Sequence, residues 1–496
     1  RAEWLRDVVG EAPAILDSAL TRRSADQLRL YLHKEGWFDA RVSDTTIYRG
    51  RKAVVTYRIA PGEPYRLHAI SDPIDDPMIR YYVRSDSANS VLHIGDRFSA
   101  EALDRERLRV ADLLKEEGYL FYSREWMFFD ADTSAGVRKV DLRARMAPPG
   151  ASDTLGILGT PQGRIWYVDS ITVNMSRRDD GFDRLPRDTV HYDGYAFIYN
   201  GSRPEFKPKA LSRALTLPPG ERFRQSRADR TYRRLTNLRV FDRVDITYDT
   251  LHTRGNDRVN CTIDLLPSKR QGLSSEGFLT NRGGLLGTSV GLTYKHRNLF
   301  RSMAALTATV NLGFEAQRNI VGASDAETAV GEDVLFNTLE VGPEVSLRLP
   351  KALMIDRWFK RSNDPRTTLT ALFNYQRRPD YTRTLMRGSF GWAFSETAQK
   401  TWTVIPVEMN LVRIPEISTG FASYLAESND PVLRDSYTDH VILNVPKVTY
   451  TLNTQGEKKQ RNVLLYQAFA ELAGSALHAV NRVRDSPLTT DTAGNR

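Results

Sequence analysis

In the first half of the chain, apolar residues recur three times at the spacing of a helix. Each of these segments begins at a residue suited to cap a helix, ends abruptly, and is followed by two segments of alternating polarity. The predicted first and last residues of the three helices are Ser24 and Gly36, Ser99 and Gly118, and Ser226 and Asn237. The paired strands predicted after them are residues 37–48 and 53–59, 119–129 and 137–146, and 240–248 and 258–266.

An earlier strand and a short helix precede the second and third copies of this pattern. The strands are predicted at residues 65–70 and 165–173, and the helices at 77–83 and 208–215. The first copy shows only the short helix, at 14–20, so we expect its opening strand to lie before Arg1. The repeated unit is therefore strand, helix, helix, strand, strand, with boundaries expected at residues 1–61, 62–150 and 160–270.

From about residue 273 the pattern changes to strict alternation, which is the signature of β-strands. No further capped helix is predicted there, and about nine strands can be read. Those given bounds are 273–281, 286–297, 306–315, 341–349, 367–378, 401–412, 440–453 and 463–474, with alternation also at 389–395. In residues 306–315, apolar Val310 and Leu312 alternate with polar Thr309 and Asn311.

Strands that alternate apolar and polar residues occur in two architectures, a soluble β-sandwich and a membrane β-barrel. For residues 271–496, three features favour a membrane barrel and not a soluble sandwich. Many of these strands reach ten or more residues, as a tilted bilayer crossing requires. The face opposite the apolar one carries Glu, Arg and Asn, which a dry core would not tolerate. The connections 316–333 and 426–439 are long and polar.

Composition bears on three further features: helices that cross a membrane, disulfide bonds, and metal or catalytic sites. The 496 residues contain no apolar run long enough to cross a bilayer as a helix, and the net charge of +9 reflects 70 basic against 61 acidic residues. The single cysteine, Cys261, excludes an internal disulfide and is expected to be buried. The histidines are scattered, so we expect no metal site. The sequence also has no phosphate-loop or nucleophile-elbow motif, so we expect no cofactor, no catalytic site and no enzyme.

Three short stretches carry a resemblance to a known family: 34–42 (KEGWFDARV), 116–126 (EEGYLFYSREW) and 236–246 (TNLRVFDRVDI). They resemble POTRA domains, the periplasmic modules of the BamA/TamA superfamily. Later segments are similar to sequences of the superfamily's TamA-like lipoprotein branch in Bacteroidetes, TamL. They are residues 365–368, 377–381, Trp392 and 406–411. The resemblance implies α+β POTRA repeats followed by an antiparallel transmembrane β-barrel. Because the family barrel has about sixteen strands, we expect only about half of it here.

Two candidate functional elements follow from this resemblance. The first barrel strand, with Leu273, Gly277, Phe278, Leu279 and Gly283, would form one side of a lateral seam that opens to receive a client strand. Its glycines would weaken pairing, because glycine contributes no side-chain packing. The second element, Asn298, Leu299 and Phe300, resembles the family's short periplasmic turn. Arg301 replaces the usual glycine after it.

The resemblance implies an outer-membrane protein of a Gram-negative bacterium that captures unfolded clients on POTRA edge strands and inserts or exports them. Its expected partners are client outer-membrane proteins, outer-membrane lipid and a TamB-like periplasm-spanning protein or accessory lipoproteins, with no nucleic acid. Alternatives are a BamA-like general insertase, a two-partner-secretion pore for one exoprotein, and a barrel fused to a hydrolase outside this chain.

Overall fold

The computed structural model describes residues 15–50, 52–134, 136–146, 163–175, 187–253, 256–282, 285–316, 336–359, 363–428, 430–455 and 462–473. The chain forms two compact units. One comprises residues 1–169, 220–228 and 250–260, and the other comprises residues 170–219, 229–249 and 261–496. The predicted boundaries of the repeats remain predictions.

The first repeat consists of one helix and a hairpin, α2 (Ser18–Lys34), β1 (Arg41–Arg49) and β2 (Lys52–Ala60). The prediction of two helices here, 14–20 and one starting at Ser24, is wrong over the described residues. Asp17 is the cap, since its carboxylate accepts hydrogen bonds from the N–H groups of Ala19 and Leu20. The Ser24 hydroxyl instead donates to the carbonyl of Leu20 at 2.8 Å, within the helix.

The second repeat contains every element of the predicted unit: β3 (Arg66–Ser71), α3 (Pro77–Ser85), α4 (Ala100–Glu116), β4 (Met127–Asp132) and β5 (Lys139–Met146). The strands lie in the order β3-β5-β4, with β3 parallel to β5. Ser99 caps α4 as predicted, accepting from Ala102 N–H at 3.3 Å. Residues 119–126 are not a strand as predicted, because they form turns and the 3₁₀ helix η3 (Arg124–Trp126).

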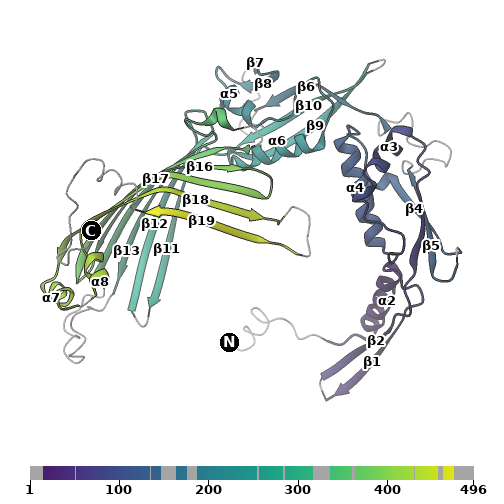
Figure 1. The fold of residues 1–496 in the computed structure, drawn as a ribbon, viewed down its shortest axis with the longest axis horizontal. Helices are drawn as coiled ribbons and strands as arrows, with labels where there is room; N and C mark the ends of the chain where they lie inside the picture. The colour runs from purple at the N-terminus through teal and green to yellow at the C-terminus, as the bar shows by residue number, and fades with distance from the viewer. Residues whose placement is uncertain are drawn as a thin grey trace. The chain divides into compact units, whose positions relative to one another are not determined.

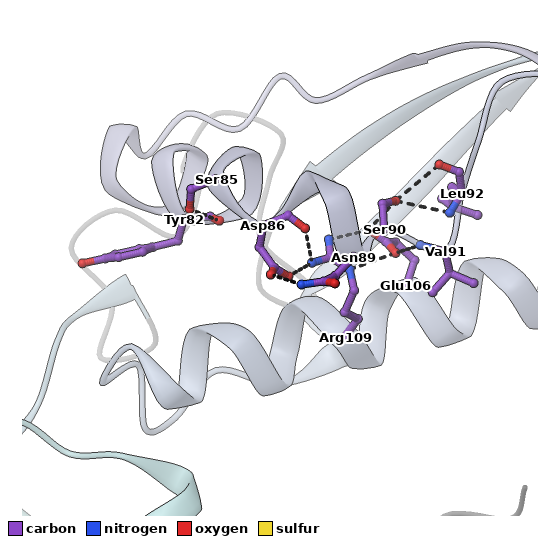
Figure 2. A network of polar contacts seen from close by, with 9 residues as sticks. All are labelled: Tyr82, Ser85, Asp86, Asn89, Ser90, Val91, Leu92, Glu106 and Arg109. Atoms are coloured by element: carbon purple, nitrogen blue, oxygen red, sulfur yellow. Dashed lines mark hydrogen bonds and ion pairs between the residues drawn. The ribbon is translucent and has the colours of Figure 1, made fainter.

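A polar network joins α3 to α4 through the 3₁₀ helix η2 (Ser87–Asn89). Figure 2 shows Glu106 and Arg109 reaching from α4 toward this connection. The buried Glu106 carboxylate accepts from Val91 N–H at 2.8 Å and pairs with the Arg109 guanidinium at 2.6 Å. Arg109 also forms an ion pair with Asp86, just after α3. A buried carboxylate is tolerated here because each of its oxygens has donors.

The third repeat is built on a five-stranded sheet in the order β7-β8-β6-β10-β9. Its strands are β6 (Tyr167–Asn174), β7 (Arg187–Tyr192), β8 (Tyr195–Asn200), β9 (Phe241–Thr253) and β10 (Asn256–Pro267), and its helices are α5 (Pro208–Leu211), η6 (Ser212–Ala214) and α6 (Gln225–Asn237). The hairpin β7–β8 was not predicted. Its turn residues Asp193 and Gly194 have φ of 55° and 82°, as an Asp-Gly hairpin turn requires.

The structure corrects the predicted start and end of α6. Ser226 lies inside the helix, and its N–H and hydroxyl donate to the Glu116 carboxylate on α4 at 2.9 and 2.8 Å. The left-handed residue after the helix is Arg239, with φ of 55°, and not Asn237, which is the last helical residue.

The rest of the described chain forms a nine-stranded antiparallel sheet in chain order, with β11 and β19 at its edges (Figure 1). The predicted number of strands is confirmed over the described residues. The strands are β11 (Gln271–Arg282), β12 (Leu285–Leu299), β13 (Ala304–Glu315), β14 (Thr338–Leu349), β15 (Arg366–Arg377), β16 (Tyr381–Ser395), β17 (Lys400–Ile417), β18 (His440–Asn453) and β19 (Leu465–Ala473). The predicted fold class, α+β repeats followed by part of an antiparallel β-barrel, is thus shown.

The connection between β17 and β18 corrects the expectation that no helix follows residue 273. It contains α7 (Thr419–Glu427) and α8 (Pro431–Ser436), capped by Ser418 and Asp430. Phe421 and Leu425 of α7 pack against Tyr381 at the start of β16. A buried apolar cluster thus holds the two short helices on the end of the sheet. None of the described helices has the length and apolar character needed to cross a membrane.

Candidate functional site

The nine-stranded sheet presents two chemically different faces. Cross-strand register places Val310, Pro343 and Met386 in line on one face, and Thr309 and Glu344 on the other. The apolar face is not covered: Val310 is 47% exposed and Met386 46% exposed. The polar face carries its own network, in which Arg387 donates to Asn410 at 2.7 Å and Asn374 donates to Glu340 at 2.6 Å. The sheet therefore exposes large apolar side chains on one face, while the Glu, Arg and Asn network lies on the other.

The predicted seam strand lies at an edge of this sheet. β11 pairs with β12 through twelve consecutive residues from Gln271 to Arg282, and no second strand pairs with it among the described residues. Leu273 is 69% exposed and Leu279 is 89% exposed. Over the described part of the chain, the outer edge of β11 from Gln271 to Thr280 therefore offers its backbone groups to another strand.

The predicted seam residues do not all share one face. Leu273, Gly277 and Leu279 alternate along the apolar face, whereas Phe278, paired with Ser289, projects from the polar face and is 55% exposed. A Cβ atom added at Gly277 would meet nothing within 4 Å, so no packing constraint requires glycine there. Gly283 lies outside the described residues.

The predicted turn residues lie at the connection from β12 to β13. Asn298 and Leu299 still belong to β12, while Phe300 begins the turn and is 72% exposed. Asn298 is 5% exposed; its side-chain NH₂ donates to the carbonyl of Glu205 at 3.0 Å, and its side-chain oxygen accepts from Met303 N–H at 3.1 Å. Asn298 therefore anchors the turn to the segment before α5.

Arg301 has the conformation that favours the glycine it replaces. Its φ is 60°, and Phe300 and Met303 also have positive φ. The carbonyl of Arg301 accepts from Lys207 N–H at 2.8 Å, and its guanidinium donates to the carbonyl of Pro204. The strained turn is therefore fixed to the segment 204–207 by both backbone and side chain.

Sequence analysis missed a basic hollow beside the start of β11. It is lined by Arg239, Lys269, Lys295, Arg297, Arg348 and Arg366, together with the carboxylate of Asp242. These cations come from five separate segments of the chain, so no local motif connects them. The only signal in the sequence was the excess of basic residues. Among the described residues, no group of side chains could hold a metal ion.

Comparisons with known proteins gave no matching family model and no matching curated protein. Among solved structures, the chain is similar to BamA from Haemophilus ducreyi lacking POTRA domains 1–3, with 11% identity, 82% of this chain and 64% of that chain covered, and a TM-score of 0.41. It is similar to CdiB from Acinetobacter baumannii, with 11% identity, coverage of 93% and 72%, and a TM-score of 0.39.

A third similar structure is Haemophilus influenzae BamA POTRA3–5, with 14% identity, coverage of 52% and 84%, and a TM-score of 0.29. This chain spans less than two thirds of the Haemophilus ducreyi structure. All three likenesses are distant, with identities of 11 to 14%.

Proposed function

We propose that this chain belongs to an outer-membrane protein that inserts or translocates other proteins. In this proposal the sheet β11–β19 crosses the outer membrane of a Gram-negative bacterium, and the three α+β repeats lie in the periplasm. The repeats, with boundaries at residues 1–61, 62–150 and 160–270, receive unfolded client proteins. Assignment to the TamA-like branch, and work with a TamB-like protein or accessory lipoproteins, are finer parts of the same proposal.

The exposed apolar face of the sheet is the observation that supports a membrane-spanning role for β11–β19. Side chains such as Val345 and Met409, 45% and 48% exposed, would face water in a soluble protein. In a bilayer they would contact lipid, while the polar face would contact water. The strands contain 9 to 18 residues, which meets the length that a tilted crossing requires.

The edge strand β11 is the proposed working element. A client strand that pairs with β11 would gain backbone hydrogen bonds without any requirement on its side-chain sequence, which suits a protein with many clients. Gly277 lies opposite Val290 on β12 and leaves the pair without side-chain contact. Glycine at 277 likewise offers no side chain to a strand paired along the outer edge of β11, and this weak packing favours exchange of that strand.

The test compares Gly277→Val with Gly388→Val in the full-length protein. Both glycines lie in strands, and an added Cβ atom would meet nothing within 4 Å at either one, but Gly388 lies in the interior strand β16. Valine at 277 would contact the side chains of the strand paired along the outer edge of β11 and stabilise that pairing by about 1 kcal/mol. In proteoliposomes, wild type should accelerate insertion of an unfolded outer-membrane protein, and Gly277→Val should slow insertion about fivefold.

Insertion is measured as the protease-protected, heat-modifiable fraction of client over time. Gly388→Val should insert the client at the wild-type rate. The proposal fails if wild type does not accelerate insertion over empty liposomes. The role of β11 fails if the two variants behave alike.

A further inference from the structure

The basic hollow has a large excess of positive charge. It encloses about 780 Å³, within the usual range of ligand sites. Its lining holds six Arg and Lys side chains and one carboxylate, Asp242, which already accepts a hydrogen bond from Ser268. Arg366 is paired with Asp364. Arg239, Lys269, Lys295 and Arg348 form no ion pair with any described residue.

The floor of the hollow consists of small side chains on the polar face of the sheet. Lys295 on β12 pairs with Thr307 on β13, which pairs with Ser346 on β14. Arg348 lies two residues beyond Ser346 and pairs with Ala305. The small residues of β13 therefore leave open space between the cations of β12 and those of β14.

The spacing of the cations fits an extended chain better than a single small anion. Strands lie about 4.8 Å apart, so β12 and β15, which carry Lys295 and Arg366, are separated by about 14 Å. Side chains on one side of an extended peptide repeat every ~6.7 Å. Carboxylates at three alternate positions of an extended peptide would therefore span about the distance that separates β12 from β15.

The hollow lies on the wrong face for a lipid headgroup and beside the proposed working strand. Its floor is on the polar face, whereas lipid in the proposed arrangement covers the apolar face. Arg297 borders β11, since a Cβ atom added at Gly272 would lie 3.8 Å from its guanidinium nitrogen. A segment held in the hollow would therefore reach the start of β11.

We infer that this basic hollow binds extended acidic segments of client polypeptides, with carboxylates at alternate positions, next to the strand that receives the client. The inference rests on the proposed function and adds a substrate class to it. Charge complementarity of this kind raises the rate of capture and selects the segment that docks first.

The experiment measures peptide binding to the full-length protein in phosphatidylcholine nanodiscs. The probe is a dye-labelled ten-residue peptide of alternating Glu and Thr, followed by fluorescence anisotropy, and the matched probe has Gln in place of Glu. We expect the Glu peptide to bind, the Gln peptide to bind at least about tenfold more weakly, and 1 M salt to remove the difference. Equal binding of the two peptides would overturn the inference.

The variants test the location of the site. Lys295→Gln/Arg348→Gln should weaken binding of the Glu peptide about tenfold, and Lys295→Arg/Arg348→Lys should retain it. The matched control, Lys400→Gln/Arg413→Gln, removes the same charge from the same sheet outside the hollow and should bind as wild type does. Unchanged binding by the first variant contradicts the inference.

Three further outcomes distinguish failure of this inference from failure of the proposed function. If inorganic phosphate displaces the peptide at equal concentration of charge, the hollow is a small-anion site and the inference is wrong. If the Glu peptide binds as predicted but wild type does not accelerate client insertion, the proposed function fails while the binding site stands. If insertion proceeds and the peptide does not bind, only this inference fails.

Discussion

At the scale of single residues, the positions that depart from a simple pattern are the most informative. Arg301 occupies a left-handed position next to two other residues of positive φ, and it is held by contacts to Pro204 and Lys207. The resemblance of residues 298–300 to the family's periplasmic turn marks Arg301 as a departure from the usual glycine. The structure gives the reason that glycine suits the position, because only glycine adopts this φ without strain.

This reading predicts a difference between two substitutions at position 301. Arg301→Gly and Arg301→Ala both remove the guanidinium contact to Pro204, but only glycine relieves the strain of φ 60°. The glycine variant should be the more stable of the two by about 1 kcal/mol. Thermal unfolding of the full-length protein, followed by loss of the heat-modifiable form, checks the order. Equal stabilities would show that the turn is not strained.

Cys261 gives a second prediction at this scale. It is 1% exposed in β10, and burial raises the pKa of its thiol to about 12. Because the thiolate is the reactive form, the folded protein should not react with N-ethylmaleimide at pH 8, and urea should restore full reaction. Mass spectrometry of the labelled chain measures this. Rapid labelling without urea would mean that β10 is not buried.

At the scale of elements, local patterns predicted the regular strands and missed the exceptions. Strict alternation was sufficient to find the nine strands, because each has one apolar face. The helices α7 and α8 were missed inside a polar connection, although Ser418 and the Asp430-Pro431 pair are helix-start signals. Short capped helices that depend on packing against Tyr381 cannot be recognised from periodicity alone.

The network of Figure 2 predicts a strong effect at the joint between α3 and α4. Arg109→Met would leave the Glu106 carboxylate, 6% exposed at its side chain, buried without its cationic partner, at a cost of about 3 kcal/mol. The control Arg124→Met removes ion pairs with Asp104 and Glu125 at an arginine that is 47% exposed, and it should lower stability far less. The urea midpoint for proteolytic cleavage within residues 77–116 measures both. Equal effects would contradict the role given to Glu106.

At the scale of the whole molecule, the order of elements could be predicted but the basic hollow could not. The repeats and the sheet follow from patterns within about fifteen residues, and three copies of one pattern reinforced each other. Arg239, Lys295 and Arg348 are separated by more than fifty residues each. The register of β12, β13 and β14 brings Lys295 near Arg348, and Arg239 joins them from the connection between α6 and β9. Sites assembled by long-range pairing leave no local signal in one sequence.

The central claim is that one face of the sheet contacts lipid and the other contacts water. The most direct measurement places single cysteines at Val310 and Leu312 on the apolar face and at Thr309 and Asn311 on the polar face, with Cys261 left buried. Each carries a fluorophore in proteoliposomes. We predict that brominated phosphatidylcholine quenches positions 310 and 312, and that aqueous iodide quenches positions 309 and 311. Quenching of all four positions by iodide alike would mean that the sheet does not cross a membrane, and would contradict the account.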